Sequence, residues 1–304
     1  FIVFKPTGDC FPLATDGKPC PIIIDADEDP GVKMAVDNLQ QDIFSVCGTK
    51  PEISTHVNSR YAVLVGTYRS PLIQRLLSSG KLEKKELEGK REKYLLQTVS
   101  SPCDGVEKAL VIAGSDKRGA IYGIYELSGQ IGVSPWYWWA DVPVHKHKHI
   151  YIKPGIYTDG EPKVEYRGIF INDEWPCMGN WAKEKFGDFN STFYKHVFEL
   201  VLRLKGNFMW PAMWGSAFYD DDPQNGVLAH TMGVVMGTSH HEPMALAQQD
   251  WKRRGKGAWD YTQNKKGLND FWTYGIERAK NWESVITIGT VSYTHLTLPT
   301  SDLV

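Results

Sequence analysis

The sequence lacks the features that mark several large classes of protein. Its five cysteines are scattered, odd in number and never spaced as CxxC, which indicates neither a disulfide framework nor a zinc ribbon. No apolar run approaches about 18 residues, the length that a membrane-spanning helix needs. Net charge is -2, with 34 basic and 36 acidic residues well mixed along the chain, so nothing favours a nucleic-acid or membrane partner.

The chain also lacks an initiator methionine and a signal-peptide pattern near its start. We interpret this as a trimmed N-terminus, left either by removal of a signal peptide or because the sequence is a fragment. The first alternative predicts a secreted or periplasmic protein.

Aromatic residues, by contrast, are abundant: 11 Trp, 14 Tyr and 12 Phe. Many of the tryptophans lie among polar residues, in the runs PWYWWAD, NDEWPCMGNW and WPAMW. Flat apolar rings beside hydrogen-bonding groups suit sugars, which offer C–H faces and hydroxyl rims. The alternative is that these rings fill cores and cover helices.

Residues 1–155 alternate strand-like and helix-like segments. Apolar and β-branched runs predict strands, and apolar residues at helical spacing predict helices. The expected strands are 21–26, 61–66, 94–99 and 109–114, and the expected helices are 32–47, 70–77 and 116–132. This pattern predicts a compact α/β layer domain.

The segment GSDKRGA (114–120) has the G-x-x-x-x-G spacing of a phosphate-binding loop. Ala-Ile replaces the Lys-Ser/Thr pair that should follow, so we reject nucleotide binding. Ser115 or Asp116 is then expected to cap a helix, with Gly119 and Gly123 forming a smooth face against the sheet.

The run VPVHKHKHIYIKPG (142–155) would, as a strand, place His145, His147 and His149 on one face, where three imidazoles could bind zinc. An alternating His/Lys run is more typical of a solvated sheet edge. We favour that interpretation and expect no metal. The KPG and EPK turns that follow indicate an interdomain connection.

From residue 163 to residue 289 the rhythm changes to repeated strand–helix units. Strands are expected at 164–171, 207–210, 233–237 and 284–289, with helices at 190–206, 243–254 and 268–281. Strands that are continuous apolar runs between helices indicate a parallel sheet covered by helices. We predict the first half, about four strands, of a (β/α)8 TIM barrel.

Polar and aromatic residues follow the first three of these strands, in NDEWP, WPAMW and GTSHHEP. In a barrel, chemistry occurs on the loops after the carboxyl ends of the strands. Asp173 and Glu174 could act as acid or base, or grip sugar hydroxyls. Trp210 and Trp214 could form a stacking wall. Loop capping and barrel packing are the structural alternatives.

The run GTSHHEP brings His240, His241 and Glu242 together. A thermolysin-like zinc site needs H-E-x-x-H on a helix, and adjacent histidines on a loop do not meet that need. Donors without a permanent charge, including the Thr238 and Ser239 hydroxyls, suit an acidic sugar, and Glu242 could fix the tautomer of one histidine. We favour substrate binding; a structural role and a metal site stay open.

At these residues the chain resembles the xylan α-glucuronidases of glycoside hydrolase family 115. The resemblance covers roughly residues 20–289 and is carried by AGSDKRGAIYGIYELS, GVSPWYWWADVPV, YRGIFINDEWP, FELVLRLKGNFMWPAMW and VVMGTSHHEPM. It implies an N-terminal α/β domain, a (β/α)8 barrel and C-terminal domains. It also implies hydrolysis that releases (4-O-methyl)glucuronic acid from glucuronoxylan with inversion, without a metal or cofactor. The implied partners are glucuronoxylan or aldouronic oligosaccharides, and a second copy of the full-length protein in a homodimer.

The resemblance also assigns site residues. The pocket of the family maps onto Asp173, Trp210 or Trp214, His240, His241 and Glu242, and Glu174 stays a candidate from its position alone. An inverting mechanism needs two carboxyl groups, one acid and one base. The family supplies further carboxylates from later strands, so we expect the catalytic pair there, with Asp173 and Glu242 as the candidates within this chain.

After Gly289 the sequence departs from the family and continues as TVSYTHLTLPTSDLV. This tail resembles translated sequencing-adapter read-through, so we expect residues 290–304 to be non-native and the later strands of the barrel to be missing. Such a chain would be inactive as a glucuronidase. Two other functions stay open: a carbohydrate-binding protein without turnover, and a metallohydrolase that uses the His/Glu loop.

An open half-barrel leaves its first and last strands as bare edges. We therefore predict that the purified chain is poorly soluble or only partly ordered in its second half. Hydrogen exchange combined with thermal unfolding measures this. A monomer that unfolds cooperatively, with full protection of residues 284–288, would contradict the prediction.

Overall fold

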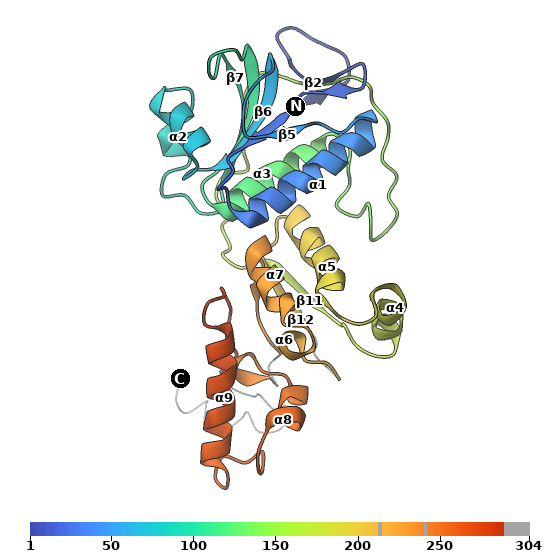
Figure 1. Cartoon of the computed structure of the whole chain (residues 1–304), viewed down its shortest axis with the longest axis vertical. Coiled ribbons are helices and arrows are strands. Elements are labelled where there is room, and N and C mark those ends of the chain that lie inside the picture. The colour runs from blue at the N-terminus through green and yellow to red at the C-terminus, as the bar shows by residue number, and fades with distance from the viewer. Residues whose placement is uncertain (212–214, 240–241, 289–304) are drawn as a thin grey trace. The chain divides into compact units, whose positions relative to one another are not determined.

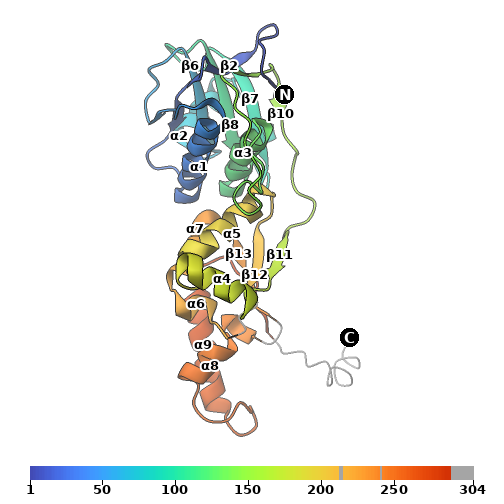
Figure 2. The same cartoon turned by 90° about the vertical axis from the view of Figure 1, so that its right-hand side faces the viewer.

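The computed structural model describes residues 1–211, 215–239 and 242–288. The chain divides into two compact units. Unit 1 comprises Phe1–Glu165 and Leu202–Lys205, and unit 2 comprises Tyr166–Val201 and Gly206–Val304. Their elements are drawn from two sides in Figure 1 and Figure 2.

Unit 1 is built on a six-stranded sheet in the order β10-β7-β8-β6-β4-β5. Strands β8, β6, β4 and β5 run parallel; β7 pairs antiparallel with β8, and β10 pairs antiparallel with β7 at that side of the sheet. The central strands are almost wholly apolar because both faces of the sheet are covered. The bounds are β4 (Ile22–Ile24), β5 (Ile53–Ser54), β6 (Tyr61–Thr67), β7 (Tyr94–Ser100), β8 (Lys108–Gly114) and β10 (Ile156–Tyr157).

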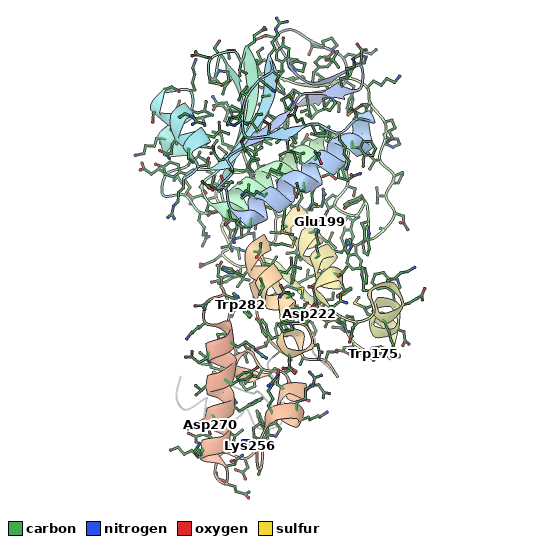
Figure 3. The ribbon with its side chains drawn as sticks, in the orientation of Figure 1. Trp175, Glu199, Asp222, Lys256, Asp270 and Trp282 are labelled. Atoms are coloured by element: carbon green, nitrogen blue, oxygen red, sulfur yellow. The ribbon has the colours of Figure 1, made fainter. Side chains whose placement is uncertain are left out.

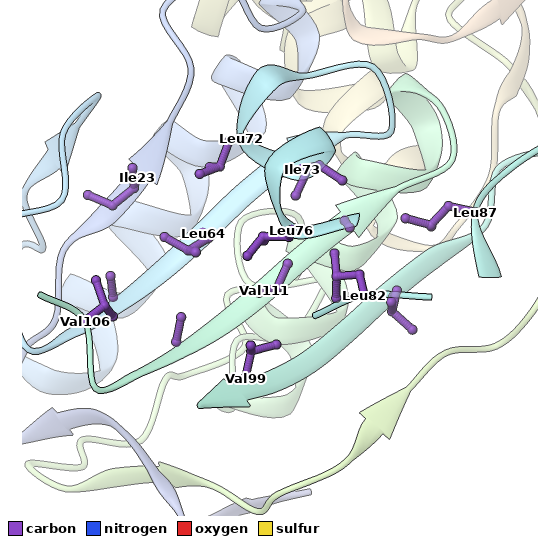
Figure 4. Close-up of a cluster of buried hydrophobic side chains, with 14 residues drawn as sticks. Ile23, Leu64, Leu72, Ile73, Leu76, Leu82, Leu87, Val99, Val106 and Val111 are labelled. Carbon is purple, nitrogen blue, oxygen red and sulfur yellow. The ribbon is translucent and has the colours of Figure 1, made fainter. Parts of the chain in front are cut away.

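Helices cover the two faces of this sheet. Helices α1 (Pro30–Cys47) and α3 (Lys117–Gln130) lie side by side on one face (Figure 1). Helix α2 (Pro71–Ser78) covers the other face, over the buried cluster drawn in Figure 4. Successive side chains of a strand point to opposite faces, so Val111 joins the α2 cluster while Ile112 faces α3.

The start of α3 explains the glycine-rich segment before it. Asp116 accepts a hydrogen bond from the Gly119 N–H at 2.8 Å and caps the helix, as predicted. A Cβ atom at Gly119 would clash with the Lys93 carbonyl oxygen, and one at Gly123 would lie 2.9 Å from Ile112 Cγ2. The two glycines therefore let α3 lie close on the sheet.

A four-stranded antiparallel sheet, in the order β1-β9-β2-β3, completes unit 1. Of the strand considered over residues 142–155, the structure contains only β9, and the residues before β9 form no strand. His147 stacks on Phe4 and His149 faces Asp16, so the histidines make separate contacts instead of lining one strand. The bounds are β1 (Ile2–Val3), β2 (Phe11–Thr15), β3 (Lys18–Pro19), β9 (Ile150–Ile152) and the 3-10 helix η1 (Lys84–Glu86).

Unit 2 contains a three-stranded parallel sheet, β11-β12-β13, with helices between its strands. This alternation confirms the predicted α/β class, while the barrel itself stays a prediction. Among the described residues, no helix has the length and hydropathy needed to cross a membrane. The bounds are β11 (Gly168–Ile171), α4 (Cys177–Phe186), α5 (Ser191–Arg203), β12 (Phe208–Pro211), α6 (Phe218–Asp221), α7 (Gln224–Met232), β13 (Val235–Met236), the 3-10 helix η2 (Pro243–Ala245), α8 (Gln248–Arg254) and α9 (Lys265–Ala279).

Two expected elements of unit 2 are shorter than the sequence suggested. The fourth strand is reduced to one parallel bridge between Met236 and Ser284, next to which the Val285 N–H donates to the Met236 carbonyl oxygen at 3.0 Å. The helix expected at 243–254 is broken because Met244 has a φ of 59°, a left-handed conformation that no helix continues through. Only α8 is regular.

Gly119→Ala tests the close approach of α3 to the sheet. The added Cβ would meet a backbone carbonyl, so we expect a loss of about 1–3 kcal/mol in the free energy of unfolding. Gly129→Ala is the matched control in the same helix, since a Cβ there meets nothing within 4 Å; this variant is expected to gain about 0.5–1 kcal/mol. Denaturant unfolding measures both, and equal stabilities would contradict the packing described here.

Candidate functional site

The strands of unit 2 end at one edge of their sheet. Ile171 at the end of β11 is in register with Pro211 at the end of β12, and β13 pairs with β12 in the same direction. Because the strands are parallel, the segments that follow them leave the sheet at the same edge. The register therefore brings residues 172–175 and 238–239 to one end of unit 2.

Asp173 follows β11 and is only 1% exposed. The hydroxyl of Tyr194, on α5, donates a hydrogen bond to Asp173 Oδ2 at 2.5 Å. Burial and the neighbouring Asp173 carboxylate raise the pKa of Tyr194 well above its ordinary value, so the phenol stays protonated and remains a donor. This bond fixes the orientation of the carboxylate.

Glu242 lies on the loop after β13 and is 4% exposed. Its Oε1 accepts a hydrogen bond from the Gln248 backbone N–H at 3.3 Å, and its Oε2 has no hydrogen-bond partner among the described residues. Burial raises the pKa of Glu242 to about 8; the Gln248 bond opposes this, and the charges of Asp250 and Asp173 add to it. The side chain is therefore protonated at neutral pH, and its O–H is a potential donor.

Hydrogen bonds hold the Glu242 loop on both sides. Thr238 Oγ1 donates to the Glu242 carbonyl oxygen at 2.7 Å, and the Glu242 N–H donates to the Ser239 carbonyl oxygen at 2.9 Å. Thr287 Oγ1 donates to the Thr238 carbonyl oxygen at 3.0 Å. The hydroxyl proton of Thr238, which the sequence suggested for an anionic sugar, is therefore used by the loop itself.

A buried ion pair supports the same loop. Arg278 Nη1 lies 3.2 Å from Asp250 Oδ1, with side-chain exposures of 12% and 1%, and Arg278 Nη2 donates to the Ala245 carbonyl oxygen at 2.8 Å. Asp250 also accepts a hydrogen bond from the Ala247 N–H at 2.8 Å. Arg278 thus compensates the charge of Asp250 and leaves Glu242 as the carboxyl group that is neutralised by a proton.

The other predicted site residues divide into two groups. Glu174 and Trp210 are half-buried, and the Trp210 ring centre lies 5.3 Å from that of Phe170. Three predicted residues lie outside the described residues: Trp214, His240 and His241. Their roles stay predictions.

Two residues near this edge were not predicted from the sequence, Tyr194 and Trp175. Trp175 is 44% exposed and lies beside α4 (Figure 3). Its ring covers Gly179, where a Cβ would come within 2.5 Å, and Lys183 Nζ lies 5.9 Å from the ring centre. A tryptophan directly after Asn-Asp-Glu, with a glycine four residues later, was the available signal. Tyr194 had none, because its partner is distant in sequence.

The described residues contain no group of three His, Cys, Asp or Glu side chains that could hold a metal ion. The metallohydrolase alternative therefore gains no support from this part of the chain. Its two histidines, His240 and His241, lie outside it.

The raised pKa of Glu242 predicts a pH dependence of stability. The folded chain holds the proton between the ordinary pKa of 4.5 and about 8, so the free energy of unfolding falls as pH rises through this window, by up to about 1.4 kcal/mol per pH unit. Among the described residues, the charged groups around Glu242 are Asp173, Asp250 and, through Asp250, Arg278.

Glu242→Gln is expected to remove this slope, and Glu277→Gln, an exposed control on α9, is expected to leave it unchanged. Denaturant unfolding across the pH window measures both variants. A Glu242→Gln protein with the wild-type slope would show that another group titrates.

Residues 159–292 match glycosyl hydrolase family 115, and residues 15–127 match the N-terminus of glycosyl hydrolase family 67. No curated protein matches the chain.

Solved structures extend this likeness over almost the whole chain. A family GH115 4-O-methyl-α-glucuronidase, BtGH115A, described as specific for decorated arabinogalactans, is 31% identical with a TM-score of 0.80; the alignment covers 93% of this chain and 37% of that chain. A Streptomyces plicatus β-hexosaminidase is 11% identical with a TM-score of 0.47, over 77% of this chain and 43% of its own, which is too weak to support an argument.

This chain therefore spans little more than a third of the length of its solved relative. Its second half matches the family directly, and its fold follows that of a family member over 93% of its residues. The chain belongs to glycosyl hydrolase family 115.

Proposed function

We propose that this glycoside hydrolase chain carries part of the sugar pocket of an α-glucuronidase, which removes (4-O-methyl)glucuronic acid side chains from a plant polysaccharide such as glucuronoxylan. The observation that supports this most directly is the buried Glu242 side chain, whose Oε2 lacks a hydrogen-bond partner among the described residues and whose pKa is raised by burial to about 8. Family membership supports a glycosidase, and the state of this side chain supports an acidic sugar.

A protonated Glu242 suits a ligand that carries a carboxylate. A glucuronosyl group is anionic at neutral pH, and an ionised glutamate beside it would repel it. A neutral carboxylic acid instead donates its O–H to the anionic oxygen, and such charge-assisted hydrogen bonds are short and strong. Apolar surroundings keep a carboxyl group neutral for the same purpose in other enzymes.

Asp173 offers a complementary interaction. Held by Tyr194, its carboxyl group is suited to accept hydrogen bonds from sugar hydroxyls, which donate in fixed directions from the ring. A donor for the acid group and an acceptor for the hydroxyls would together distinguish a uronic acid from a neutral hexose.

We further propose that the complete protein hydrolyses its substrate with inversion, using an acid and a base about 6.5–9.5 Å apart. Asp173 accepts a hydrogen bond from Tyr194, and Glu242 is protonated. Neither side chain is therefore in a state to act as the base that activates water. The base is expected outside the described residues. The chain alone is therefore expected to bind the sugar without releasing it from a polymer.

The polymer itself is part of the proposal. BtGH115A is described as specific for decorated arabinogalactans, whereas the sequence resemblance favours glucuronoxylan, so both belong in a substrate test. Such polymers lie outside cells, which supports a secreted or periplasmic protein. The homodimer expected of the full-length protein is tested by its oligomeric state.

Titration of D-glucuronic acid into the 304-residue chain tests Glu242. We expect wild-type affinity to fall as pH rises through about 8, because the ionised side chain loses its donor and repels the ligand. Glu242→Gln keeps an N–H donor, so its affinity should not vary over that range. Glu242→Ala should bind about 10- to 100-fold more weakly than the wild type below about pH 8, since a hydrogen bond to a charged group contributes about 1.5–3 kcal/mol, and should lose this disadvantage above it.

Glu184→Gln, an exposed variant on α4, is the matched control and should follow the wild type. Neutral xylo-oligosaccharides should show no such pH dependence. A wild-type chain that binds glucuronic acid equally on both sides of the Glu242 pKa, or not at all, would refute the role proposed for Glu242.

A further inference from the structure

Residues 248–281, which contain α8 and α9, differ in composition from the rest of the chain. They carry eight Lys and Arg residues against four Asp and Glu, whereas the whole chain has a net charge of -2. They also hold three tryptophans: Trp251, Trp259 and Trp272. Positive charge and aromatic rings therefore concentrate in one part of unit 2.

Two hollows lie on this segment and share a wall. The first, of about 230 Å³, is bordered by Trp251, Trp259 and the loop residue Pro243. The second, of about 250 Å³, is bordered by Trp259, Tyr261, Trp272 and again Pro243. We call the surface formed by these four aromatic residues and Pro243 the aromatic groove.

Packing accounts for some of these rings but not for all. Trp251 packs edge to face on Phe271, which is 6% exposed, and belongs to the core between α8 and α9. Trp259 packs edge to face with Trp251 and Trp272, and Tyr261 stacks on Trp272. The two rings nevertheless remain 49% and 46% exposed, so part of their surface faces outward. Trp272 Nε1 is buried without a hydrogen-bond partner among the described residues. Packing of the core does not explain exposed aromatic rings beside a buried donor without a partner, and such a surface is typical of a binding site.

Positive charges without ion-pair partners surround the groove. Within the part of the chain that the structure describes, Lys252 and Lys265 form no ion pair. Lys252 borders the first hollow, and Lys265 Nζ lies 5.8 Å from the Tyr261 ring centre. Uncompensated lysines next to aromatic faces attract an anionic, ring-containing ligand.

The aromatic groove begins where the Glu242 loop ends. Pro243, which borders both hollows, directly follows Glu242, and Gln248, whose N–H binds Glu242 Oε1, borders the first hollow. A polymer whose uronic acid reached Glu242 would therefore have its neighbouring sugars next to the groove.

We propose that the aromatic groove binds the main chain of an acidic polysaccharide beside the uronic acid that binds at Glu242. This rests on the function proposed above. Trp259 and Tyr261 stack on the C–H faces of successive sugars, and Lys252 and Lys265 attract further uronate groups along the polymer.

Affinity electrophoresis of the 304-residue chain in gels that contain glucuronoxylan tests the aromatic groove. Trp259→Ala is expected to bind about tenfold more weakly, as for a central aromatic contact. Trp259→Phe keeps a ring and should retain most of the affinity, which preserves the comparison if the alanine variant folds poorly. Trp136→Ala, which removes a 44% exposed tryptophan from unit 1, is the matched control and should bind as the wild type does.

The lysines are tested with a second polymer. The double variant Lys252→Ala, Lys265→Ala should bind glucuronoxylan more weakly at low salt, yet bind carboxyl-reduced glucuronoxylan as the wild type does. Lys85→Ala, an exposed site in unit 1, is the control.

The outcomes separate this proposal from the proposed function. If neither Trp259→Ala nor the lysine variant changes polymer binding, the aromatic groove is overturned, whatever happens to glucuronic acid. If polymer binding depends on Trp259 while the wild type does not bind glucuronic acid, the groove stands and the role proposed for Glu242 is overturned. Equally tight, Trp259-dependent binding of single-stranded DNA would identify a general polyanion surface and overturn the specificity proposed here.

Discussion

The parallel pairing of β11, β12 and β13 is the constraint on which the candidate site depends. It requires close contact between neighbouring backbones: a Cβ at Gly168 would overlap the Phe208 carbonyl group. It also determines where each strand ends, and a slip of one residue would turn every side chain of a strand to the other face. Asp173 and Glu242, far apart in sequence, therefore owe their common position to hydrogen bonds between backbones.

Three buried carboxyl groups near that edge are each compensated in a different way. Asp250 is paired with Arg278, Asp173 accepts a hydrogen bond from Tyr194, and Glu242 keeps a proton. Burying three unpaired negative charges together would be prohibitive. These different environments also give the side chains different roles. Protonated Glu242 is a hydrogen-bond donor and Asp173 is an oriented acceptor, although both are carboxylic acids.

Local sequence signals predicted much of the fold, whereas features that depend on contacts between distant residues could not be predicted. The apolar runs, the Asp116 cap and the close-packing glycines of α3 are local features, and the structure agrees with them. The strand considered over 142–155 and the helix expected over 243–254 are both shorter in the structure than the sequence suggested. For the helix the reason is Met244, because composition does not reveal that a residue is left-handed. The polar residues after the strands indicated where a site would lie. The protonation of Glu242 depends on burial, which only the folded chain reveals.

The bridge between Met236 and Ser284 has a consequence for how such proteins diversify. The bridge pairs the two residues that flank the segment 237–283. The positions at which this segment leaves and rejoins the sheet are therefore fixed. Lengthening or replacing a segment with fixed ends costs little free energy of loop closure. Replacement of α8 and α9 would therefore leave the strands and their pairing unchanged.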